Sequence, residues 1–185
     1  MSSRGVLYVL GSAALPVLDV GVVVRAAQGE GWNVCLGLTP TAAEWLGGEL
    51  AELEALTGHP VKSRYRRPGD PELWPAASAV LLAPATFHTI NALALGITGS
   101  WVVGFAAEAI GKGIPMAVMP CVNTALLAHP QAGQSLAVLR EAGVAVLLGE
   151  GGFVPNAPGE GQPAEYPWAA ALAGVARLGD GARRG

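Results

Sequence analysis

The sequence predicts an α/β fold: a single domain with a doubly wound, Rossmann-like parallel sheet and helices on both of its faces. Five short runs are apolar at nearly every position, which is typical of strands that are buried on both faces. Segments of helical character follow most of these runs, and that order builds β–α–β units. The runs end in glycine, proline or small polar residues, as expected where ligands approach the carboxyl ends of parallel strands.

In the first half of the chain, two apolar runs are each followed by a helix signal. A glycine breaks the run at 5–10, and a helix is expected over 15–28. After the run at 33–38, Thr39 is a suitable helix N-cap, and the next residue is a proline, which is favoured at the first helical position. A further helix is expected over 49–56.

The second half begins with a polar, basic segment at 61–74, which predicts an exposed excursion. Near the end, a glycine- and proline-rich loop at 151–163 leads to the last helix.

We expect one α/β unit over 1–150, with the loop and helix of 151–185 packed on the same domain. The expected strands are 79–83, 115–119 and 144–148, the expected helices are 89–95, 102–110, 134–141 and 168–178, and residues 179–185 are expected to fray.

The composition limits the classes of partner. The chain has 185 residues and a formal net charge of −3, which argues against nucleic acid and anionic membranes because both require a basic face. Only 14% of the residues are charged, which favours a protein that covers part of its surface by self-association. The sequence lacks both a signal-peptide pattern and a run of about 18 apolar residues, so we expect a cytoplasmic protein without a membrane partner.

Three residues stand between a predicted strand and a helix start: Gly11, Ser12 and Thr39. Free backbone amides and hydroxyls at such places can bind a phosphate, although simple N-capping would explain the same residues. The sequence carries neither the dinucleotide-binding pattern G-x-G-x-x-G nor the P-loop pattern. A mononucleotide or another phosphorylated cofactor therefore fits better than a dinucleotide.

Two reactive side chains also follow predicted strands. His88 lies in the segment that follows the third strand, and this position shifts the interpretation toward ligand contact, although a lone histidine more often has a structural role. Cys121 follows the fourth strand, where it is either a reactive thiol or a buried structural cysteine. The three histidines are scattered without the cysteine or glutamate spacing of a metal site, so no metal is expected.

Two motifs at the strand ends carry a family resemblance. Residues 84–89, Pro-Ala-Thr-Phe-His-Thr, are similar to a Pro-Ala-Ser-Ala-Asn-Thr motif, and residues 120–127 are similar to Pro-x-Met-Asn-x-x-Met-Trp. These motifs characterise the flavoprotein superfamily of homo-oligomeric flavin-containing cysteine decarboxylases, which includes phosphopantothenoylcysteine decarboxylase and the lantibiotic peptidyl-cysteine decarboxylases. The sequence resembles this family from about residue 5 to residue 148, and most of all an actinobacterial branch of it.

The resemblance implies FMN as the cofactor, bound between the subunits of a homotrimer or of a dodecamer built from trimers. It also implies a peptide, or a small molecule with a thiol and a carboxylate, as the substrate. The FMN phosphate is expected at Gly11, Ser12 and Thr39. The flavin ring is expected near Thr86, His88 and Thr89, with Cys121 at its edge. Pro84 and Ala85 of the same motif are also expected to bind the cofactor.

The implied reaction is oxidative decarboxylation of a C-terminal cysteine of a peptide, in which Asn123 holds the carboxylate and His88 is a candidate acid/base. The chain departs from the family pattern at two catalytic positions, with Trp74 in place of a histidine and Ala92 in place of a lysine. The alternative is therefore a non-catalytic or degenerate oligomer of the same fold that binds flavin or another ligand. Flavin prenyl transfer is a weaker third option. No cysteine follows Cys121, so a role in coenzyme A biosynthesis is not expected.

Overall fold

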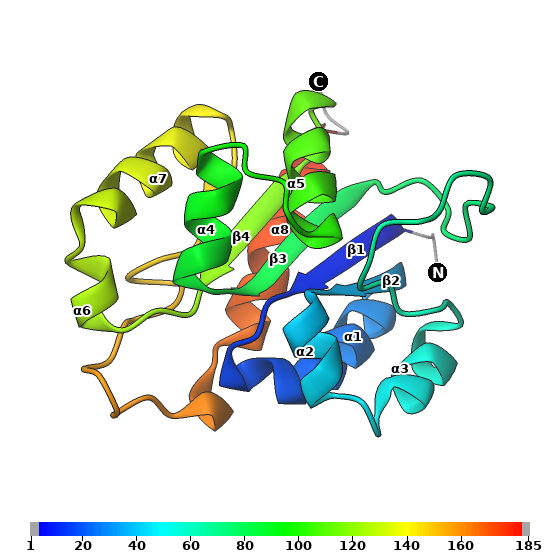
Figure 1. The fold of residues 1–185 in the computed structure, drawn as a ribbon, viewed down its shortest axis with the longest axis horizontal. Helices are drawn as coiled ribbons and strands as arrows, with labels where there is room; N and C mark the ends of the chain where they lie inside the picture. Colours follow the sequence, from blue (N-terminus) through cyan, green and yellow to red (C-terminus); the bar gives the residue numbers. More distant parts are fainter. Residues whose placement is uncertain (1–3, 183–185) are drawn as a thin grey trace.

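A five-stranded, all-parallel sheet forms the centre of the molecule, in the order β2-β1-β3-β4-β5 (Figure 1). The computed structural model describes residues 4–182, with side chains up to residue 178. The sheet confirms the predicted doubly wound α/β fold. Its strands are β1 (Gly5–Gly11), β2 (Trp32–Leu38), β3 (Ala79–Ala85), β4 (Met116–Pro120) and β5 (Ala145–Val146).

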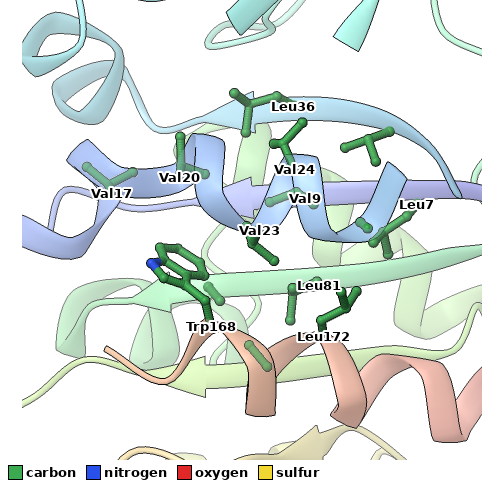
Figure 2. Close-up of a cluster of buried hydrophobic side chains, with 14 of the residues drawn as sticks. Leu7, Val9, Val17, Val20, Val23, Val24, Leu36, Leu81, Trp168 and Leu172 are labelled. Carbon is green, nitrogen blue, oxygen red and sulfur yellow. The ribbon is translucent and has the colours of Figure 1, made fainter. Parts of the chain in front are cut away.

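Helices cover both faces of the sheet because alternate strand residues point to opposite sides. In β1, Leu7 and Val9 belong to one buried cluster, and Tyr8 and Leu10 belong to the other. The first cluster packs α1 and α8 against the sheet, as Figure 2 shows, and the second packs α4, α5 and α7. The helices are α1 (Val20–Gly29), α2 (Pro40–Trp45), α3 (Leu50–Thr57), α4 (Phe87–Ala94), α5 (Trp101–Gly111), α6 (Thr124–Leu127), α7 (Pro130–Glu141) and α8 (Trp168–Ala182), with 3-10 turns η1 (Leu15–Asp19) and η2 (Pro163–Glu165).

Several helix starts differ from the prediction because local capping decides them. The helix expected over 15–28 is split, since Asp19 leaves helical dihedral angles between η1 and α1. α4 begins two residues early because the Thr86 side chain accepts a hydrogen bond from the Thr89 amide. The short α6 was not predicted, and its cap is Asn123, whose Oδ1 accepts from the Leu126 amide at 2.9 Å. α7 begins earlier than expected because His129 caps it.

The C-terminal segment is built into the core. Trp168 and Leu172 of α8 are buried against the sheet, and the Tyr166 hydroxyl donates to the Met119 carbonyl of β4 at 2.9 Å. α8 runs on to Ala182, so the prediction that the chain frays from residue 179 is wrong for 179–182, and 183–185 lie outside the described residues. Within residues 4–182, no helix has the length and apolar character needed to cross a membrane.

The basic segment at 61–74 is exposed only in part. Lys62 pairs with the edge of β2 through hydrogen bonds with the Leu36 carbonyl and the Leu38 amide. Its ammonium group lies 4.5 Å from the centre of the Trp74 ring and forms an ion pair with Glu72. Trp74 is itself buried, because the indole packs edge-on against Tyr8 at 4.7 Å. The expectation of an exposed excursion is therefore wrong at these two residues, which aromatic packing and a cation–π contact hold against the domain.

The packing of α8 predicts that the C-terminal segment unfolds together with the sheet. Leu172→Ala removes a buried side chain from the interface between α8 and the sheet, and should lower the free energy of unfolding by about 2–5 kcal/mol. Leu73→Ala is the matched control because Leu73 is 56% exposed, and it should change stability by less than about 0.5 kcal/mol. Chemical denaturation measures both, and equal effects of the two variants would contradict the assignment of α8 to the core.

Candidate functional site

The carboxyl ends of β1 and β3 are joined through Ser12. Its hydroxyl donates to the Pro84 carbonyl at 2.8 Å and accepts from the Thr86 amide at 3.3 Å. The end of β2 is held beside them, since the Thr39 amide donates to the Gly11 carbonyl at 2.9 Å. The topology thus brings together three of the strand ends that the sequence singled out.

A cavity of about 290 Å³ opens at these strand ends, and we call it the hydroxyl cavity. Five of the predicted residues line it: Ser12, Thr39, Thr86, His88 and Thr89. Thr41 and Ser100 also line it and were not predicted as site residues. Ser100 carried a usable signal, because a serine directly before an apolar helical stretch is a typical N-cap. No charged side chain is among the lining residues, so hydroxyl and amide groups provide the polar contacts.

The Thr39 hydroxyl is the unusual group of this cavity. Thr39 occupies the N-cap position of α2, but its side chain makes no capping hydrogen bond, and its Oγ1 is buried without any hydrogen-bond partner. A buried polar atom without a partner costs about 1–3 kcal/mol, and a ligand that accepts its hydrogen bond removes that cost. The cavity therefore fits a ligand with acceptor oxygens, such as a phosphate.

Three residues that were predicted to contact the cofactor are buried behind the residues that line the cavity. Gly11, Pro84 and Ala85 are buried and are not among the lining residues. A Cβ atom at Gly11 would lie 3.0 Å from the Val17 side chain and 3.2 Å from the Leu38 side chain, so a larger residue would crowd the packing between β1 and its neighbours. Pro84 acts through its carbonyl, which accepts the Ser12 hydroxyl.

His88 stands at the mouth of the hydroxyl cavity. It lies in the first turn of α4, and its side chain is exposed. Thr86 and Thr89 flank it and are joined to each other by a 3.0 Å contact between their hydroxyl oxygens. The imidazole can therefore reach a molecule that occupies the cavity.

Cys121 and Asn123 line a second, neighbouring cavity of about 350 Å³, together with Leu126 and Phe153. The two cavities are close because Ala13 lines the first and Leu15 lines the second. Burial raises the pKa of the Cys121 thiol to about 11, so the group is protonated near neutral pH and is not a thiolate nucleophile.

Asn123 has one half of its amide committed and the other half available for a ligand. Oδ1 accepts the Leu126 amide as the cap of α6, whereas the Nδ2 group has two protons to donate. A substrate carboxylate in the second cavity is a suitable acceptor for Nδ2.

Trp74 lines a third cavity, of about 770 Å³, which we call the aromatic cavity. Its walls include Tyr8, Tyr65, Trp101 and Phe105. Ser100 lines the hydroxyl cavity and the next residue, Trp101, lines the aromatic cavity, so the N-terminus of α5 separates the two. The residue that replaces the family histidine is thus absent from the walls of the hydroxyl cavity.

Comparison with known proteins gives one family and many related folds. A family model described as Flavoprotein matches residues 3–173. TvaF of thioviridamide biosynthesis, an FMN-dependent cysteine decarboxylase, superposes with a TM-score of 0.71 at 21% identity over 95% of this chain and 98% of that chain. The cypemycin decarboxylase CypD gives 0.71 at 18% identity over 96% and 95%. EpiD, an epidermin biosynthesis protein from Staphylococcus aureus, gives 0.62 at 19% identity over 77% and 81%. No curated protein sequence matches the chain.

The unpartnered hydroxyl predicts an unusual stability change. Thr39→Val keeps the shape of the side chain and removes the orphaned polar atom, so it should raise the free energy of unfolding of the unloaded protein by about 1 kcal/mol. Thr86→Val is the matched control, because it deletes the N-cap of α4 and should lower stability by about 1 kcal/mol. Urea denaturation of the two variants measures this difference in sign, and a loss of stability in Thr39→Val would mean that the hydroxyl has a partner.

Proposed function

Because the chain belongs to the Flavoprotein family, we propose that it binds FMN at the hydroxyl cavity and uses it to decarboxylate the C-terminal cysteine of a peptide oxidatively. The observation that carries the proposal is the buried, unpartnered Thr39 hydroxyl among the strand ends of β1, β2 and β3. The names of two related structures, an FMN-dependent cysteine decarboxylase and the cypemycin decarboxylase, support the choice of cofactor and reaction.

The FMN phosphate is assigned to the inner part of the hydroxyl cavity. Thr39 donates its hydroxyl to a phosphate oxygen, and Thr41 and Ser100 supply further hydroxyl groups from neighbouring walls. The Ser12 hydroxyl keeps its internal bond to Pro84, so it holds the strand ends in place instead of turning to the phosphate. When bound, the flavin supplies a hydride acceptor for oxidation of the thiol-bearing carbon.

The substrate carboxylate is assigned to Asn123 in the second cavity. The capping bond to Leu126 fixes the Oδ1 side of the amide, and this orients Nδ2 as the donor. Cys121 lies beside it as a neutral thiol, which adds no negative charge to repel a carboxylate. His88 is the one histidine among the residues that line the hydroxyl cavity, and it is the candidate for moving a proton there.

A non-catalytic flavin-binding protein is the second candidate. Trp74 packs in the aromatic cavity, and Ala92 is 5% exposed in the core cluster on the same side of the sheet. Neither position can therefore provide the proton-transferring or charged group that the family pattern has there. If His88 does not replace them, the chain binds FMN without turnover.

The same proposal includes self-assembly into a homotrimer, or a dodecamer of trimers, in the cytoplasm. The low fraction of charged residues supports it. So do Leu95 and Ile97, which are 58% and 57% exposed on the segment that leads from α4 to Ser100. A second copy that covers these two side chains would lie beside the hydroxyl cavity.

Cofactor binding has a direct test on the purified protein. FMN at 100 times its dissociation constant should add about 2.7 kcal/mol to the free energy of unfolding, which is visible as a rise in melting temperature together with a bound-flavin absorption spectrum. NAD is the control, because the chain lacks the dinucleotide pattern and should not respond to it. A protein that shows neither the spectrum nor the rise with FMN contradicts the proposal.

His88→Asn separates catalysis from contact. Asparagine is smaller than histidine and offers both a donor and an acceptor, so the variant should bind FMN at least as tightly as the wild type. A fall in turnover of about 100-fold or more with unchanged FMN affinity assigns proton transfer to His88, and retained turnover assigns it a contact role. His59→Asn is the control, since His59 bonds Asn33 at 3.0 Å outside the cavity. Turnover is measured on a peptide that ends in cysteine, by the loss of mass that accompanies its decarboxylation.

A further inference from the structure

A short segment between α4 and α5 borders two cavities at once. Ser100 lines the hydroxyl cavity, and Thr98 lines the aromatic cavity. Within a single copy of the chain, side-chain packing holds this segment weakly, because Leu95 and Ile97 have more than half of their surface exposed. The position of Ser100 therefore depends on other contacts.

Tyr65 provides one of these contacts from a distant part of the sequence. Its hydroxyl donates to the Thr98 carbonyl at 2.9 Å and lies 3.2 Å from the Ser100 carbonyl, which is a second acceptor. The Ser100 carbonyl also accepts the Gly104 amide at 2.9 Å, in the first turn of α5. The phenol thus fastens the 61–78 segment to the residues at the start of α5.

Gly104 is the residue that lets the phenol approach. A Cβ atom at this position would overlap the Tyr65 hydroxyl and would lie 3.0 Å from Tyr65 Cζ. Glycine in the middle of a helix is otherwise unfavourable relative to alanine. Its presence in α5 fits a requirement for close approach of the tyrosine.

We propose that Tyr65 is a positioning residue for the cofactor: by tethering the 98–100 backbone it holds Ser100 at the wall of the hydroxyl cavity. This inference rests on the proposed binding of FMN there. The Ser100 Oγ accepts the Val103 amide at 3.3 Å, so its proton is left to donate to the ligand. When Ser100 is tethered, its position is already that of the bound state. Without the tether, Ser100 must be ordered when the ligand binds, and this loss of conformational entropy lowers the affinity.

Three variants test the tether through FMN affinity, measured by quenching of flavin fluorescence. Tyr65→Phe should raise the Kd for FMN about fivefold, which corresponds to about 1 kcal/mol. Gly104→Ala should do the same, because its methyl group displaces the phenol while alanine favours the helix. In the double variant the two effects should not add, since both remove one contact.

Tyr8→Phe is the matched control. Tyr8 also lines the aromatic cavity, but its hydroxyl donates to the Pro75 carbonyl at 2.8 Å, which is outside the 98–100 segment. This variant should leave the Kd for FMN within about twofold of the wild type. An equal rise in Tyr8→Phe and Tyr65→Phe, or an unchanged Kd in Tyr65→Phe, overturns the inference.

Hydrogen exchange in the unloaded protein separates failure of this inference from failure of the proposed function. Tyr65→Phe should speed exchange of the amides at 98–104, and Tyr8→Phe should not. A wild-type protein that does not bind FMN refutes the proposed function. In that case, unchanged exchange at 98–104 in Tyr65→Phe overturns the tether as well, and faster exchange supports it.

Discussion

The hydrogen bonds of one hydroxyl group, that of Ser12, hold the candidate site together. By donating to Pro84 and accepting from Thr86, it joins the carboxyl ends of β1 and β3 at the point where α4 begins. Thr86 then caps α4, and this sets the place of His88 in the first turn. Ser12 satisfies its own hydrogen bonds inside the protein, whereas the Thr39 hydroxyl is the one that is buried without a partner among the described residues that line the cavity. Ser12, at the end of β1, thus has a structural role, and Thr39, at the end of β2, is the proposed ligand contact.

Much of this arrangement was predictable, because its signals are local in the sequence. The apolar runs indicated buried parallel strands, and the residues after them indicated where a ligand binds in such a sheet. The sequence could not distinguish residues on the cavity wall from residues beneath it. Gly11 and Ala85 are buried by neighbouring strands, and that burial depends on contacts between segments far apart in the chain. For the same reason the separation of Asn123 from the hydroxyl cavity was not predicted.

The basic segment shows a further limit of sequence patterns. Lys62 and Trp74 lie in a stretch whose composition indicates solvent exposure, yet Lys62 pairs with the edge of β2 with its ammonium group over the Trp74 ring, and Trp74 packs against Tyr8 of β1. Tyr65 from this stretch then reaches the start of α5. Trp74, where the sequence departs from the family pattern, is therefore part of an aromatic cluster with Tyr8 and Trp101. This leaves His88 as the histidine beside the proposed flavin.

The proposed FMN site depends most on the Thr39 hydroxyl, which we propose binds the phosphate. Riboflavin lacks that phosphate, so the Kd values of FMN and riboflavin for the wild type and for Thr39→Val form a cycle that isolates the contact. We expect Thr39→Val to weaken FMN binding about tenfold, because a hydrogen bond to a charged group is lost, and to leave riboflavin binding unchanged. Equal weakening of both ligands, or no change for FMN, would contradict it.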